Sequence, residues 1–180
     1  MKIAAVLFAS AVAFTTYSLH ASTGDLPDGW ALQGEAPQLY SASIDRADSP
    51  SGKGSVVLQR AETSHPYGSA WLLQPLAADY AGKCIRLSYH IRSQGAEVPD
   101  SGIVVRDSHG QHTMSLMKED NWVWIKHVIS LPKDTKAMST GVSLKGPGTI
   151  KIDAVTVEVL GDAPADQPAR RIRKSEDCTK

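Results

Sequence analysis

Two closely spaced tryptophans offer the clearest chemistry for recognising a ligand. Trp122 and Trp124 stand two residues apart in an alternating segment, so both side chains would leave the same face of a strand. An exposed indole stacks well on a sugar ring, because the ring's C–H face is apolar while its rim donates and accepts hydrogen bonds. The alternative is that one of the two indoles covers a second small core, since buried tryptophans are common in β-sandwiches.

A second alternating segment, 83–92, would bring cations beside these indoles. Its apolar side chains fall on one face, and its polar ones, Arg86, Ser88, His90 and Arg92, fall on the other. Cationic and amide side chains beside an aromatic platform could hold sugar hydroxyls or a carboxylate. We therefore expect the ligand-binding residues to be Arg86, His90, Arg106, Trp122, Trp124 and Gln74.

Arg106 has two interpretations, because it lies between Val105 and Asp107 in an apolar segment. It could be a ligand-binding cation or half of a buried ion pair with Asp153 or Asp107. The sequence favours the ion pair, since a guanidinium pairs bidentately with a carboxylate and tolerates burial better than an ammonium group.

Catalytic and metal-binding motifs give no assignment. His109 and His112 frame a turn, but Asp107 is the only acid close to them, so we predict no metal site. His127 falls on an apolar face and is expected to be a core histidine. The chain has no G-x-S-x-G nucleophile motif, and its carboxylates show no paired arrangement for glycoside hydrolysis. We predict a protein that is not an enzyme and needs no cofactor.

The ends of the chain point to export. Residues 1–21 resemble a secretory signal peptide, with Lys2 at the start, a short apolar run from Ile3 to Phe14, and Ala21 before the cleavage point. Periplasmic or secreted localisation follows, and in that compartment Cys84 and Cys178 are expected to form a disulfide. The apolar run is too short to span a bilayer, and no transmembrane segment is expected after cleavage.

The segments that position these residues are short strands. About nine or ten strands at a spacing of 8–12 residues, separated by turns rich in glycine and proline, predict an all-β sandwich at 22–160. The last strand changes phase, because its apolar residues shift from even to odd positions at Asp153–Ala154, which predicts a β-bulge. From Gly161 onward the composition predicts a polar, mostly unstructured tail, 161–180.

Composition excludes one class of partner. The formal net charge of the 180 residues is zero, whereas a nucleic-acid-binding domain would carry a basic field. Apolar residues make up 42% and charged residues 21%, which are ordinary values for a folded domain.

The order of these features resembles a known superfamily between Gly29 and Leu160. The matching residues are Gly29-Trp30, Gly34, Tyr40, Gln74, Tyr80-Ala81-Gly82-Lys83, Arg86-Leu87-Ser88, Arg106, Trp122, Gly141-Val142, Gly146-x-Gly148 and Ile152-Asp153-Ala154-Val155. The chain is similar to the jelly-roll sandwiches of the galactose-binding-like and carbohydrate-binding-module superfamily, especially those appended to bacterial regulators and envelope proteins. Many such modules carry calcium and paired acids in the last segment, but here Asp153 is the only acid in that motif.

The resemblance implies an antiparallel jelly-roll β-sandwich that binds a saccharide or cell-wall glycan on a concave sheet face. Two alternatives remain open. One is an envelope domain that contacts another protein, and the other is an enzyme of unknown reaction, because jelly rolls host lyases and hydrolases.

Overall fold

The chain folds into two packed β-sheets. The computed structural model describes residues 22–23, 26–60, 68–76, 80–96, 101–115, 120–164, 171–173 and 178. The predicted signal peptide, 1–21, lies outside these residues. The elements are β1 (Ser22–Thr23), β2 (Ala31–Gly34), η1 (Pro37–Leu39), β3 (Ser41–Asp45), β4 (Ser55–Arg60), β5 (Ser69–Pro75), β6 (Lys83–Gln94), β7 (Gly102–Asp107), β8 (Gly110–Ser115), β9 (Val123–Ser130), β10 (Ser139–Lys145), β11 (Gly148–Asp162) and β12 (Arg171–Arg173).

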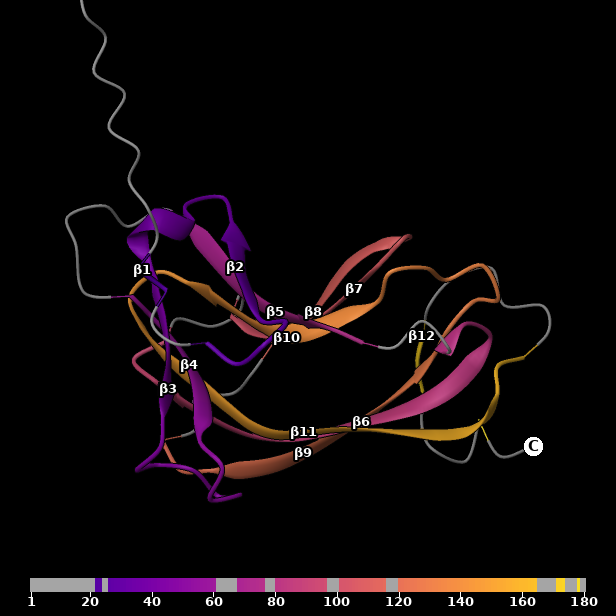
Figure 1. Ribbon diagram of the computed structural model, residues 1–180. Coiled ribbons are helices and arrows are strands. Elements are labelled where there is room, and N and C mark those ends of the chain that lie inside the picture. The colour runs from indigo at the N-terminus through magenta and orange to yellow at the C-terminus, as the bar shows by residue number, and fades with distance from the viewer. Residues whose placement is uncertain are drawn as a thin grey trace, which may run out of the picture.

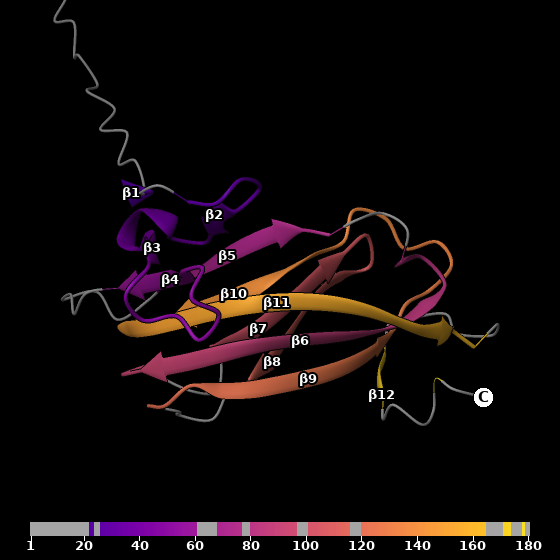
Figure 2. The same cartoon turned by 60° about the horizontal axis from the view of Figure 1, so that its bottom comes forward.

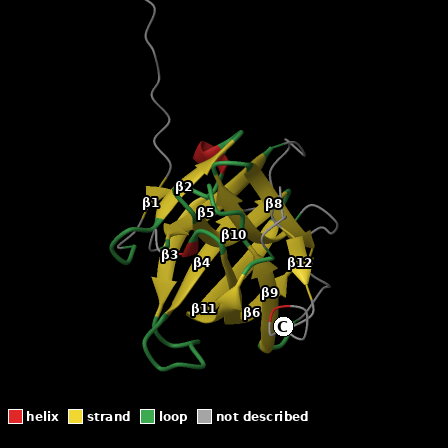
Figure 3. Cartoon of the chain, turned by 90° about the vertical axis from the view of Figure 1, so that its right-hand side faces the viewer, coloured by secondary structure: helices red, strands yellow, loops and turns green. Residues whose placement is uncertain are grey.

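The strands divide into a seven-stranded sheet, in the order β1-β3-β4-β11-β6-β9-β12, and a five-stranded sheet, in the order β2-β5-β10-β7-β8. All neighbouring strands are antiparallel except β1 and β3. Figure 1 shows the two sheets one above the other, and Figure 2 shows the strands of the larger sheet side by side in front of the smaller one. Strands dominate the described chain (Figure 3), which confirms the predicted all-β sandwich.

The core lies between the sheets and follows the alternation in the sequence. On β6, the side chains of Ile85, Leu87, Tyr89 and Ile91 are at most 1% exposed. They pack against apolar residues of the five-stranded sheet, such as Leu72 and Val142. Full burial of each such aliphatic side chain contributes about 1.5–3 kcal/mol, which makes this layer the main source of stability.

The predicted bulge in the last strand is present. The pairing of β11 with β6 shifts between Asp153 and Thr156, and Ala154 adopts a positive φ of 53°. The shift lets Ile152 and Val157 both face the core although they differ in parity.

The predicted disulfide joins Cys84, at the start of β6, to Cys178, with the Cα atoms 5.8 Å apart. Both residues are buried beside Val128 and Leu160 in a small second cluster. The sequence predicts an unstructured tail, but residues 171–173 form β12, which pairs with β9. For these residues the prediction is wrong, because the open edge of β9 offers backbone partners that the composition of the tail does not reveal.

Candidate functional site

The outer face of the five-stranded sheet is concave. In Figure 1 strand β10 is lowest at its middle and rises at both ends, away from the other sheet. A groove of about 320 Å³ lies on this face. It is lined by Glu35, Ser69, Trp71, Gln111, Thr113, Ser115 and Lys145, and we call it the concave groove.

The floor of the concave sheet face is formed by the central strands β10 and β7, which carry small residues on this face. Strand pairing sets Trp71, Ser143, Gly102 and Ser115 in one row across β5, β10, β7 and β8. A Cβ atom on Gly102 would fall on the carbonyl oxygen of Met114, so this strand packs too closely on its neighbour for any side chain. The longer side chains of β5 and β8 therefore stand as walls on either side.

Arg106 does not line the concave groove itself but adjoins two residues that do, Gln111 and Trp71. It pairs across β7 and β8 with Gln111, and its side chain crosses the sheet toward β5 and β2. Its Nη1 donates to Gln33 Oε1 over 2.9 Å, and its guanidinium carbon lies 5.2 Å from the centre of the Trp71 ring.

The predicted ion pair of Arg106 with Asp153 or Asp107 is wrong. Asp153 belongs to β11 of the other sheet, where it accepts hydrogen bonds from Ser49 and Ser51. Asp107 is buried and accepts from the backbone N–H of His109. The reason is strand parity, since neighbouring residues of a strand point to opposite faces and Arg106 points away from the core.

The other sequence-predicted residues do not share this face. Arg86, His90 and Trp124 lie on the outer face of the seven-stranded sheet, on β6 and β9. Trp124 is 43% exposed, and its ring lies 4.4 Å from that of His90, centre to centre. Arg86 donates to Glu158 over 2.7 Å. The expected grouping of Arg106 with Arg86 and His90 is therefore not formed.

Gln74 lies on β5, half-buried and paired with Thr140 of β10. The sequence prediction missed Trp71, although the alternation of Trp71 with Leu72 in the strand at 69–76 marks it as a side chain that leaves the core face.

Solved structures with the same architecture include several sugar-binding proteins. The C-terminal family 22 carbohydrate-binding module of Clostridium thermocellum Xyn10B superposes with a TM-score of 0.52 at 15% identity, over 78% of this chain and 92% of that one. TmCBM61, solved in complex with β-1,4-galactotriose, gives a TM-score of 0.51 at 12% identity, over 73% and 89%. The chain has the jelly-roll fold of carbohydrate-binding modules.

Two other matches are to parts of larger proteins. The enzymatically active domain of tailspike protein 4 from bacteriophage CBA120 gives a TM-score of 0.59 at 13% identity, over 73% of this chain and 19% of that one. An uncharacterized HTH-type transcriptional regulator, YbfP of Bacillus subtilis (strain 168), is 28% identical over 144 residues. The match covers 75% of this chain and 49% of the relative, so the chain spans about half the length of that protein. No protein-family model matches the chain.

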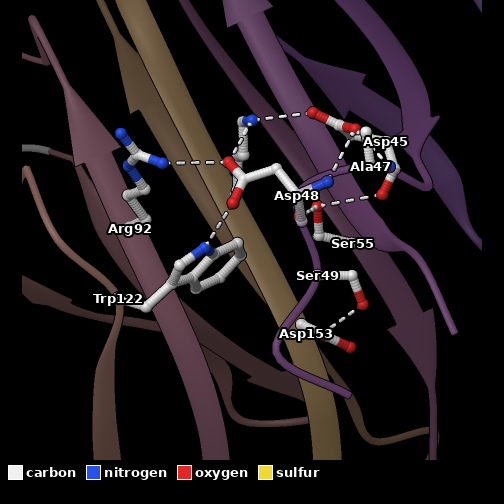
Figure 4. A network of polar contacts seen from close by, with 9 residues as sticks. Asp45, Ala47, Asp48, Ser49, Ser55, Arg92, Trp122 and Asp153 are labelled. Atoms are coloured by element: carbon white, nitrogen blue, oxygen red, sulfur yellow. Dashed lines mark hydrogen bonds and ion pairs between the residues drawn. The ribbon is translucent and has the colours of Figure 1, made fainter. Parts of the chain in front are cut away.

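Trp122 and Trp124, the two tryptophans predicted to form the sugar platform, have different environments. Trp122 precedes β9, is half-buried, and donates from Nε1 to Asp48 Oδ1 over 2.7 Å. Figure 4 shows Asp48 between Trp122 and Arg92, with the loop that carries it lying over the sheet. Trp122 therefore anchors the 46–54 loop, whereas Trp124 is exposed on the strand.

The same loop is held by a network of charges that the sequence prediction did not foresee. Lys151 Nζ lies 2.8 Å from Asp45 and 2.6 Å from Asp48, and Asp48 also accepts from Arg92 over 3.0 Å. Hydrogen bonds from Lys151 lower the pKa of both Asp45 and Asp48. Burial raises the pKa of Asp153, but hydrogen bonds from Ser51 and Ser49 outweigh it, so the net shift is downward.

A wider depression of about 530 Å³ lies beside this network, over β3 and β4. Its lining contains no aromatic residue, and two of its three charged residues, Asp45 and Lys151, already pair with each other. It therefore lacks the platform that the concave groove has in Trp71.

The lowered pKa values of Asp45, Asp48 and Asp153 predict that the fold loses stability in acid. The carboxylates of Asp45, Asp48 and Asp153 have folded-state pKa values below the unfolded-state values of about 4. Their contribution is complete above about pH 5 and is lost as the pH falls through the folded-state values. Urea unfolding measured at several pH values between 7 and 3 should show that less urea is needed to reach the unfolding midpoint once the pH is below about 4. Asp48→Asn should make the fall shallower, and an equally steep fall in that variant would contradict the assignment.

His109 has acidic neighbours, and His127 has an aromatic one. His109 lies 3.2 Å from Asp134 and 3.7 Å from Asp107, and the described residues contain no group of three His, Cys, Asp or Glu side chains that could hold a metal ion. His127 is half-buried with its ring 5.9 Å from that of Tyr89, and burial lowers its pKa. Among the described residues, no helix has the length and apolar character that a membrane crossing requires.

Proposed function

We propose that the chain is a non-catalytic module that binds a saccharide in the concave groove. The observation that carries the proposal is a tryptophan, Trp71, standing among hydrogen-bonding side chains on the concave sheet of a fold shared with carbohydrate-binding modules. Solved proteins of this fold include one in complex with a galactose trisaccharide, which supports the ligand class.

The lining of the concave groove has the mixture that sugars require. Trp71 supplies apolar surface for the C–H groups of a sugar ring. Gln111, Thr113 and Ser115 alternate along β8, so hydrogen-bonding side chains recur about every 6.6 Å along that wall. A regular row of donors and acceptors is suited to an extended oligosaccharide lying along the strand.

Export is part of the proposal. A disulfide between Cys84 and Cys178 persists in an oxidising compartment, and the first 21 residues have the charge and apolar run of a signal peptide. A periplasmic or secreted module would meet saccharides outside the cytoplasm. Determining the N-terminal residue of protein recovered from the secreting cell tests this, and a start at Met1 would contradict it.

The outer face of the larger sheet offers a second location for the ligand. The observation that favours it is the exposed indole of Trp124 beside the ring of His90, with Arg86 on the same strand as His90. Two observations count against this location. The concave groove lies on the opposite sheet, and Arg86 is already paired with Glu158.

Two matched substitutions decide between the faces. Trp71→Ala should weaken binding of the best ligand from a panel of neutral and acidic oligosaccharides by about tenfold to a hundredfold, as expected for a hot-spot residue. Trp124→Ala should leave that affinity unchanged. Isothermal titration calorimetry measures both, and thermal unfolding of each variant checks that the fold persists. A loss confined to Trp124→Ala would move the site to the larger sheet, and no binding by the parent protein across the panel would overturn the function.

A further inference from the structure

Arg106 carries a charge that no carboxylate of the described residues neutralises. Its polar contact is the side-chain carbonyl of Gln33, and its other contact is the ring of Trp71. By contrast, Lys83, Arg86, Arg92 and Lys151 each lie within 3.0 Å of a carboxylate oxygen. Arg106 is half-buried, so water solvates its charge less completely than that of a fully exposed side chain.

The guanidinium is held in a defined position. The Arg106 side chain extends from β7, and it is held by the side chains of Gln33 on β2 and Trp71 on β5. To reach them it crosses the row formed by Leu73, Gly141 and Val104, in which Gly141 has no side chain. A cation–π contact and a hydrogen bond together limit the rotamers of a long side chain, so little ordering remains to be done when a ligand arrives.

Most of its hydrogen-bonding capacity is unused. A guanidinium has five N–H donors in a planar fork, and one hydrogen bond to Gln33 occupies one of them. The ligand group that matches such a fork is a carboxylate, which accepts two parallel hydrogen bonds and also neutralises the charge. Neutral sugar hydroxyls would supply hydrogen bonds but leave the charge uncompensated.

We propose that the concave groove recognises an acidic saccharide, with the carboxylate of a uronic acid residue bound by Arg106. This rests on the proposed function. Trp71 and Gln33 act as positioning residues for the guanidinium, and Gln111, opposite Arg106 on β8, lines the groove. Glu35, two residues after Gln33, also lines the groove, and its carboxylate accepts a hydrogen bond from Ser69.

Three probes of matched length test the charge requirement. They are an oligosaccharide of galacturonic acid, the same oligosaccharide with its carboxyl groups methyl-esterified, and a neutral galactan oligosaccharide. Calorimetry at low ionic strength should give at least about tenfold tighter binding of the acid than of its ester, which corresponds to one charge-assisted hydrogen-bond pair. The preference should decline as salt is added.

Arg106→Gln should remove this preference, so that the acid and its ester bind the variant with affinities within about twofold of each other. Arg86→Gln is the matched control, because it makes the same change on the other sheet, and it should keep the preference. Equal affinity of the parent protein for acid and ester, or a preference that survives Arg106→Gln, would overturn the inference. In either case binding of any probe that depends on Trp71 would leave the proposed function standing, whereas failure to bind all three probes and the wider panel would overturn both.

Discussion

Replacing Cys84 and Cys178 together by alanine is expected to lower the free energy of unfolding by about 4 kcal/mol. The bond joins residues 94 positions apart, so it removes a large amount of conformational entropy from the unfolded chain. Chain-entropy reasoning gives about 4–5 kcal/mol for a loop of this size. Since a domain of this size is stable by only about 5–15 kcal/mol, the loss should be visible as a large shift of the unfolding midpoint.

The measurement is urea unfolding of the oxidised protein, the double variant and the parent protein in reductant. Alanine is chosen because both positions are buried, and a serine hydroxyl there would add a desolvation cost. The reduced parent should match the double variant, and reductant should leave the double variant unchanged. A parent protein that loses less than about 1 kcal/mol on reduction would contradict the expectation.

Lys151→Met is expected to cost about 2–3 kcal/mol, because one ammonium group serves two carboxylates. Its side chain is 15% exposed, and the two carboxylate side chains of Asp45 and Asp48 are each 30% exposed. Methionine keeps the length of the side chain but removes the hydrogen bonds. Asp48 would retain Arg92 and Trp122, whereas Asp45 would retain only the backbone N–H groups of its own loop.

Arg86→Met is the matched control for Lys151→Met. Arg86 of β6 also forms an ion pair with another segment of the sheet, through Glu158 of β11, but that glutamate is 61% exposed. Exposed pairs of this kind contribute about 0–1 kcal/mol. Urea unfolding at pH 7 compares the two variants. Equal losses would show that burial and the second carboxylate make no difference, and would contradict the structural role assigned to Lys151.

The sequence predicts what depends on local pattern. The alternation of Ile85, Leu87, Tyr89 and Ile91 identifies a half-buried strand and its core face, and the phase change near Asp153 identifies the bulge. The disulfide follows from the number of cysteines and the expected compartment. The strand and the bulge depend on neighbouring residues, and the disulfide depends on the single pairing that two cysteines allow.

The location of the groove depends on which sheet each strand joins, and alternation does not contain that information. Arg106 lies on an outer face, against the favoured expectation of a buried ion pair, and local pattern does not distinguish the outer face of β7 from that of β6. Arg106 and Arg86 therefore share a pattern and lie on opposite sides of the molecule. Trp71 becomes visible as a site residue only when β5 is placed beside β10, which requires contacts between residues about 70 positions apart.

Strand β12 has a consequence for how copies of the molecule behave toward one another. It occupies the outer edge of the seven-stranded sheet, pairing with Val128, Ile129 and Ser130 of β9. An uncovered edge of this kind presents a row of backbone donors and acceptors that another chain can join, which is a common beginning of aggregation. The disulfide at Cys178 holds the chain that carries β12 near that edge. Oxidation is therefore expected to protect the sheet against self-association, and material prepared with reduced thiols should be the less soluble form at high concentration.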